Sequence, residues 1–110
     1  MNLIFFILLS FITGCDSKNS WSCRGDCENG EGMRVWKDNG IEKRTWINGK
    51  LNGQGFQYFG RTSDFAGDTY EGEFKDDLYY GYGIYYDKSE DAKYKGQWKN
   101  GKSEGKGIVI

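Results

Sequence analysis

The chain has 110 residues and nearly balanced charge, with 15 Lys and Arg against 16 Asp and Glu, so it lacks the excess of positive charge typical of nucleic-acid binding. It contains no histidine, which removes the commonest general base and the commonest zinc ligand. Seventeen glycines, 17% aromatic residues and no proline are typical of short strands joined by glycine turns.

An apolar segment opens the chain. Nine of the ten residues from Leu3 to Ile12 are apolar. A bilayer-spanning helix needs about 20 residues, whereas the apolar core of a secretion signal has about 7–15. The next residues, Ile12-Thr13-Gly14-Cys15, resemble the bacterial lipobox, whose cysteine thiol receives a diacylglyceryl group. We therefore expect residues 1–14 to be a lipoprotein signal peptide. An ordinary cleaved signal, or an apolar strand with an incidental cysteine, remains an alternative.

The lipobox implies a location. Cys15 would become the lipidated first residue of an exported protein, anchored to the bacterial cell membrane or outer membrane. Acyl chains hold a protein firmly, because each buried methylene contributes about 0.8 kcal/mol. Residues 15–22 are mostly polar and are expected to form a flexible tether after the lipidated cysteine. The membrane is thus one expected partner, bound through Cys15.

Cys23 and Cys27 flank an Arg-Gly-Asp tripeptide. This stretch could present an adhesion motif, but a repeat described below already requires glycine at its centre. Two cysteines without histidine cannot complete a zinc set of four ligands. Residues four apart in a strand lie about 13 Å apart, whereas a disulfide needs Cα atoms within about 7 Å. We expect either a tight loop with a Cys23–Cys27 disulfide or a strand with separate thiols, and the short turn that follows favours the bonded loop.

A repeat runs through the rest of the chain. Tyr70-x-Gly72-x-Phe74 aligns with Tyr94-x-Gly96-x-Trp98, and a Gly-x-Gly pair begins seven residues after each final aromatic residue. Trp46 is followed by such a pair at the same distance. The pairs begin at Gly53, Gly81 and Gly105, and an earlier pair begins at Gly30. Cys23-x-Gly25-x-Cys27 then occupies the place of the aromatic motif in a shortened first unit, as expected of an atypical terminal repeat.

This pattern resembles the MORN repeat, whose units read close to Tyr-x-Gly-x-Trp-x-Asn-Gly-x-x-x-Gly-x-Gly. The resemblance covers residues 23–110 as about four units, near 23–40, 42–59, 70–87 and 94–110. The second unit has Glu42 and Arg44 at the tyrosine and glycine positions, and the third has Asp76-Asp77 in place of Asn-Gly. Residues 61–68 form a loop inserted between these two units.

The residues themselves favour an all-β fold. Alternate strand positions share one face, and Asn-Gly suits a tight hairpin turn. Each unit is therefore expected to be a hairpin, and together they would form an elongated single-layer antiparallel sheet of consecutive hairpins. A stripe of aromatic residues could serve as a binding platform, because Tyr and Trp dominate interface hot spots, but we expect most of its rings to belong to the core of the sheet. The stripe comprises Trp46, Tyr58, Tyr70, Phe74, Tyr82, Tyr94 and Trp98.

Two pairs of adjacent tyrosines suggest a binding surface. Neighbouring residues in a strand point to opposite faces, so one member of each pair must leave the core side. We hypothesise a ligand surface formed by Tyr79, Tyr80, Tyr85 and Tyr86, and expect Tyr79 and Tyr85 to be replaceable without loss of the fold. No catalytic residue, metal site or cofactor is predicted, because nucleophile–histidine sets are excluded and no glycine pair extends to a phosphate-binding motif.

Resemblance to MORN proteins implies binding or scaffolding. We expect a non-catalytic interaction module for an unknown envelope protein, with no role in nucleic-acid binding. The alternative is direct binding of lipid headgroups by the sheet, which lysines in the last unit favour: Lys93, Lys95, Lys99, Lys102 and Lys106. An envelope enzyme, working without histidine, is a third possibility.

Overall fold

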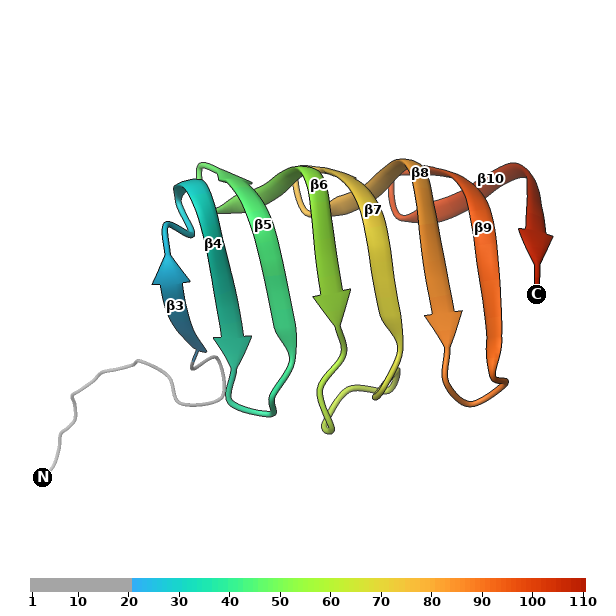
Figure 1. Cartoon of the computed structure of the whole chain (residues 1–110), viewed down its shortest axis with the longest axis horizontal. Coiled ribbons are helices and arrows are strands. Elements are labelled where there is room, and N and C mark those ends of the chain that lie inside the picture. Colours follow the sequence, from blue (N-terminus) through green and yellow to red (C-terminus); the bar gives the residue numbers. More distant parts are fainter. Residues whose placement is uncertain (1–20) are drawn as a thin grey trace, which may run out of the picture.

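The computed structural model describes residues 21–110, and the expected signal peptide and Cys15 lie outside the described residues. Eight strands form one open antiparallel sheet in chain order (Figure 1). They are β3 (Trp21–Gly25), β4 (Asn29–Trp36), β5 (Ile41–Ile47), β6 (Lys50–Tyr58), β7 (Thr69–Lys75), β8 (Leu78–Asp87), β9 (Ala92–Lys99) and β10 (Lys102–Val109). The predicted all-β sheet of consecutive hairpins is confirmed. Within residues 21–110, no helix is long and apolar enough to cross a membrane.

The same register recurs in each of four hairpins. Two positions of the repeat face each other across every hairpin, and the pairs are Gly25 with Gly32, Arg44 with Gly55, Gly72 with Gly83, and Gly96 with Gly107. The first hairpin therefore has the same register as the others, although cysteines replace the two aromatic residues of its Tyr-x-Gly-x-Trp motif. Residues 21–22, which we assigned to the tether, belong instead to β3. Trp21 pairs with Trp36 there, and their rings pack edge to face at 6.3 Å.

The turn inside each of the last three hairpins also bonds to the hairpin before it. Asn48-Gly49, Asp76-Asp77 and Asn100-Gly101 all have positive φ at both residues, as the favoured two-residue hairpin turn requires. In each turn the second residue donates its N–H to a carbonyl of the preceding hairpin, at Glu28, Leu51 and Tyr79 respectively. Asp77 Oδ1 also accepts the N–H of Leu51 at 2.8 Å, which supports the aspartate turn. These bonds stack the hairpins in a regular series.

The sheet has two different faces. The inner face carries one row across all eight strands: Cys23, Arg34, Glu42, Gln57, Tyr70, Tyr85, Tyr94 and Val109. The outer face carries another: Arg24, Met33, Lys43, Phe56, Glu71, Ile84, Lys95 and Ile108. The core comprises five buried residues, with three partly buried rings packed against them: Cys27, Trp46, Leu51, Tyr70 and Phe74, and then Tyr79, Tyr85 and Trp98.

Aromatic rings pack closely against the glycines of the repeat. A Cβ at Gly83 would lie 2.1 Å from the Tyr70 hydroxyl oxygen, so only glycine leaves space for this ring. The same glycine contacts a ring of the following hairpin, since Trp98 Nε1 donates to the Gly83 carbonyl at 3.2 Å. Trp46 Nε1 donates to the Gly32 carbonyl at 2.9 Å in the same way. The aromatic and glycine positions of the repeat therefore depend on each other.

Two members of the expected core lie on the outer face. Tyr58 pairs with Ile41 and Thr69 there and is 36% exposed. Tyr82 lies between Gly81 and Gly83 and is 51% exposed. Strand alternation directs both rings away from the side occupied by Tyr70. These two rings are therefore exceptions to the expectation that most of the aromatic stripe belongs to the core.

Arg44→Gly is expected to raise the free energy of unfolding by about 1 kcal/mol. Arg44 occupies a glycine position of the repeat and has φ of 117°, a conformation that costs a residue with a side chain about 1–3 kcal/mol. The greater freedom of glycine in the unfolded chain offsets part of this gain. Urea unfolding of the two proteins measures the difference. Arg44→Ala is the control, because alanine keeps the strain, and an equal gain in that variant would contradict the explanation.

Candidate functional site

The cysteine loop contains both a strand and a disulfide. Cys23 lies within β3 and is bonded to Cys27, with their Cα atoms 6.2 Å apart. The structure contains the disulfide that we favoured, but strand and bond are not alternatives as expected, because β3 ends at Gly25, whose φ of 85° turns the chain before Cys27. Asp26 accepts the N–H groups of Glu28 and Asn29, both at 2.9 Å. These bonds hold the pKa of Asp26 below its usual value, so this carboxylate forms part of the turn.

Replacing both Cys23 and Cys27 by serine is expected to lower the free energy of unfolding by about 2 kcal/mol, the loop-entropy value for so short a ring. The bond closes the first hairpin next to Trp46 and the other buried core residues. Urea unfolding with and without reductant measures the effect. The double-serine variant is the control for the reductant, and its stability should not change on adding it.

The four tyrosines do not form one surface. Tyr79 stacks on Tyr70 with ring centroids 3.8 Å apart and donates its hydroxyl to Gln57 at 2.7 Å. Tyr85 packs against Tyr79 and donates its hydroxyl to Asp68. Burial raises the pKa of both phenols above the usual value. Tyr79 and Tyr85 therefore belong to the inner core, and the expectation that they could be replaced without harm to the fold was wrong.

Their neighbours lie on the other side of the sheet. Tyr80 is 39% exposed, with Lys75 Nζ 5.3 Å from its ring centroid. Tyr86 pairs with Thr69 and Lys93 on the outer face, and its hydroxyl donates to Asp91. Of the predicted binding residues, only Tyr80 and Tyr86 remain available for contact from this side.

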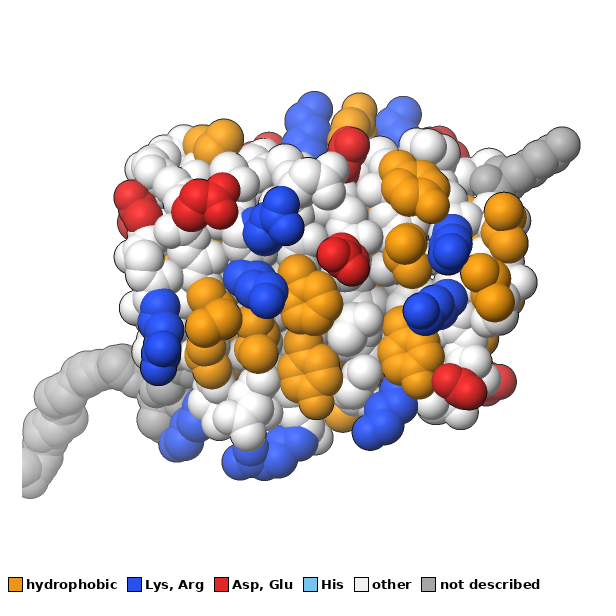
Figure 2. Space-filling view, in the orientation of Figure 1, with side chains coloured by type: hydrophobic (Ala, Val, Ile, Leu, Met, Phe, Trp, Pro, Cys, Tyr) orange, Lys and Arg blue, Asp and Glu red, His pale blue; other side chains and the backbone are white. Residues whose placement is uncertain are grey.

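The outer face combines apolar and basic side chains (Figure 2). Hydrophobic side chains gather over β4 to β6 and again over β8 to β10. Lys and Arg side chains lie among them in both groups, and an acidic side chain lies between the two groups. Pairing places Val35, Ile41, Tyr58, Thr69, Tyr86 and Lys93 in a second row beside the row that contains Phe56 and Ile84. Lys43 lies 5.2 Å from the ring centroid of Phe56. No described residue forms a second layer over this face. It is therefore a broad surface with both apolar and cationic groups.

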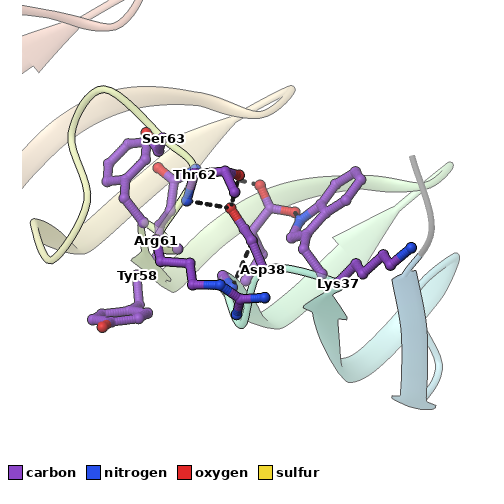
Figure 3. A pocket seen from close by; sticks show the side chains of 12 residues that line it. Lys37, Asp38, Tyr58, Arg61, Thr62 and Ser63 are labelled. Carbon is purple, nitrogen blue, oxygen red and sulfur yellow. Dashed lines mark hydrogen bonds between the residues drawn. The ribbon is translucent and has the colours of Figure 1, made fainter. Parts of the chain in front are cut away.

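A pocket of about 550 Å³ lies at one end of the hairpins. It is bounded by the turn between β4 and β5 and by the inserted segment after β6, and its lining includes Trp36, Glu42, Gln57, Phe59 and Arg61 (Figure 3). Asp38 holds the two sides together, since its carboxylate accepts the hydroxyl of Thr62 at 2.7 Å and the N–H of Gly40 at 2.9 Å. Most of the lining surface is apolar.

Glu42 lies in the wall of this pocket and is largely buried. It accepts Trp36 Nε1 at 3.1 Å and Gln57 Nε2 at 3.4 Å. Burial raises the pKa of Glu42 above its usual value, while these donors and Arg34 act in the opposite direction. Glu42 stands in the inner row at the position that tyrosine occupies in the third and fourth units.

Arg34 is surrounded by three tryptophans. Its guanidinium carbon lies 4.8 Å from the ring centroid of Trp21, 5.5 Å from that of Trp36 and 4.4 Å from that of Trp46. Nη2 donates to the Gly49 carbonyl at 3.1 Å, and Nε lies 3.6 Å from Glu42 Oε1. Such cation–π contacts are favourable when the cation is shielded from water.

Sequence reasoning missed the pocket and the arginine cluster. Glu42 offered the one local signal, because it departs from the tyrosine of the repeat. Phe59 and Arg61 carry no such signal, since only the folding of the segment between β6 and β7 places them in one pocket with Trp36. Within residues 21–110, no group of three or more His, Cys, Asp or Glu side chains is placed to hold a metal ion.

Comparison with known families gives a match to the MORN repeat over residues 45–61, 70–91 and 94–109, which together make up half of the chain. The matched segments correspond to the second, third and fourth hairpins. A comparison with curated proteins gives no match. MORN repeats form binding or interaction modules, and the recurring register of this sheet agrees with the matched segments. The chain belongs to the MORN-repeat family.

Proposed function

We propose that this protein is a lipid-anchored, non-catalytic scaffold that binds another protein at the bacterial cell envelope through the outer face of its sheet. The observation that carries the proposal is the outer face itself, where apolar side chains alternate with lysines and no described residue covers them. Uncovered apolar patches of this kind mark interaction sites. The partner's surface would be apolar, with acidic groups opposite Lys43, Lys93 and Lys95.

The anchor is supported by the sequence. The apolar run from Leu3 to Ile12 leads directly into Ile12-Thr13-Gly14-Cys15. Only a few residues separate Cys15 from β3, which begins at Trp21. With at most about 3.6 Å per residue, a lipid on Cys15 would keep the sheet close to the membrane surface.

The intact mass of the chain extracted from membranes in detergent tests the anchor. We expect a chain that begins at Cys15 and carries acyl groups. Cys15→Ser should lose the acyl mass, whereas Ser17→Ala should keep it. An unmodified wild-type chain that begins at Met1 would refute the anchor and leave the interaction surface to be tested separately.

Site-specific crosslinking in intact cells tests the interaction surface. A photoreactive amino acid at position 82, on the outer face, is expected to give a discrete adduct with one envelope protein. The same group at position 100, in the turn between β9 and β10, should give none. Equal adducts from both positions would contradict a role for this face.

Direct binding of lipid headgroups is the alternative function. Lys43, Lys93 and Lys95 on the outer face favour it, but Glu71 lies in the same row. Flotation of the delipidated domain with vesicles containing phosphatidylglycerol separates the two functions. Lipid binding predicts salt-sensitive flotation that Lys93→Glu weakens and Lys50→Glu, at the start of β6, leaves unchanged. Absence of flotation, together with a protein adduct at position 82, would exclude this alternative.

A further inference from the structure

The pocket beside Glu42 occurs at one place in the sheet and is not repeated with each hairpin. One of its sides is the segment between β6 and β7, which is an insertion between the second and third hairpins. Pockets of about 300–1,000 Å³ that combine apolar walls with a few polar groups are typical ligand sites. We propose that this pocket binds a guanidinium or ammonium group, presented by an arginine or lysine side chain of a partner peptide, with Glu42 as the acceptor.

The first observation is the incomplete pairing of Glu42. Its side chain is 18% exposed, and its nearest cation, Arg34 Nε, lies 3.6 Å from Oε1. Arg34 Nε is buried and has no hydrogen-bond partner in the structure. A carboxylate offers about four lone-pair positions, and Trp36 and Gln57 occupy two of them. Glu42 therefore retains capacity for a charged donor that enters from the pocket.

Burial of Glu42 supports the same conclusion. Desolvation raises its pKa despite its donors, so its negative charge is poorly stabilised in the free protein. A cation close to a buried carboxylate favours the charged form. Charge-assisted hydrogen bonds are also about twice as strong as neutral ones, so this carboxylate should discriminate a cation from a neutral group of the same shape.

The second observation is that the chain already holds one guanidinium with the same groups. Arg34 lies against the rings of Trp21, Trp36 and Trp46, with Glu42 as its acidic neighbour. Trp36 and Glu42 also line the pocket, where Phe59 adds a further aromatic wall. An incoming arginine would therefore meet the combination of ring and carboxylate that Arg34 meets.

The rim of the pocket carries positive charges, which affect cationic and anionic ligands in opposite ways. Arg61 and Lys37 are exposed lining residues, and in Figure 3 Lys37 extends away from the other labelled side chains. Asp38, which accepts hydrogen bonds from Gly40 and Thr62, keeps its negative charge and offsets one of these cations. These cations would weaken the binding of a positive group and strengthen that of an anion. Charge reversal at Arg61 therefore has opposite effects on the two kinds of ligand.

Nuclear magnetic resonance titration of the full chain in nonionic detergent tests the proposal. The probes are N-acetyl-arginine amide and N-acetyl-citrulline amide, which differ in charge but hardly in shape, and the readout is the indole N–H signal of Trp36. We expect the arginine probe to bind at least about tenfold more tightly. Glu42→Gln should remove this difference, and Glu90→Gln, an exposed control between β8 and β9, should retain it.

A second variant keeps the test decisive if Glu42→Gln does not fold. Arg61→Glu should tighten binding of the arginine probe, whereas Lys50→Glu should leave it unchanged. Equal affinity for the two probes in the unmodified protein would overturn the proposal. Weaker binding of the arginine probe to Arg61→Glu, or tighter binding of N-acetyl-glutamate amide to the unmodified protein, would show an anion site instead. None of these outcomes depends on the lipid anchor or on the outer face.

Discussion

Tyr70→Ala is expected to lower the free energy of unfolding by about 3–5 kcal/mol, the usual cost of removing a buried aromatic ring. Tyr70 is 0% exposed. Its ring stacks on Tyr79 and packs edge to face against Phe74 and Trp98, at 5.1 and 5.5 Å between centroids. Its loss would open a cavity where two hairpins meet. Urea unfolding followed by circular dichroism measures the change.

Tyr82→Ala is the matched control for this experiment. Tyr82 lies in the neighbouring strand but on the outer face, and it is 51% exposed. Its replacement should change stability by no more than about 0.5 kcal/mol. Tyr70→Phe should cost only about 1 kcal/mol, because it keeps the ring and removes the hydroxyl bond to the Glu73 carbonyl. Similar losses for Tyr70→Ala and Tyr82→Ala would show that the assignment of the two faces is incorrect.

Gly83→Ala is expected to lower the free energy of unfolding by about 1–3 kcal/mol, the usual cost of overpacking a core. The added methyl carbon would lie 2.1 Å from the Tyr70 hydroxyl oxygen and 2.3 Å from Cζ. The rigid ring is held by Tyr79 and Trp98 and cannot move aside without disturbing them. Urea unfolding midpoints of the variant and the unmodified protein measure the loss.

Two comparisons identify its cause. Gly53→Ala adds a methyl group with nothing within 4 Å, at φ of 83°, and should cost only the strain of that conformation, about 1–2 kcal/mol. In a Tyr70→Leu background, the cost of Gly83→Ala should fall because the ring is absent. An unchanged cost in that background would rule out contact with Tyr70 as the reason for glycine at position 83.

The repeat frame could be predicted because its signals are local. Each Tyr-x-Gly-x-Trp segment and the Gly-x-Gly pair after it belong to one hairpin, and a two-residue turn sets the register between them. The Asp76-Asp77 turn, which departs from Asn-Gly, keeps the same conformation, so one substitution did not disturb the frame. The hairpins span residues 21–36, 41–58, 69–87 and 92–109, close to the predicted units.

The candidate binding surface was only partly predictable. Alternation within a strand correctly required one tyrosine of each pair to leave the core side, but it does not say which one. That choice depends on the pairing of Tyr79 with Phe74 and of Tyr85 with Tyr70 in the adjacent strand. The disulfide was likewise not decided by spacing alone, because the turn at Gly25 sets the distance between Cys23 and Cys27.

By itself, the sequence determined the all-β class, the hairpin series and the equivalence of the four units, since these follow from periodic residues that interact with their near neighbours. Only the tertiary structure decided which rings are buried, how Arg34 is enclosed by tryptophans, and where the pocket lies. Those features depend on contacts between different hairpins, and on the segment between β6 and β7, whose Phe59 and Arg61 line the same pocket as Trp36 and Glu42. Their physical basis is packing between units, which no single repeat encodes.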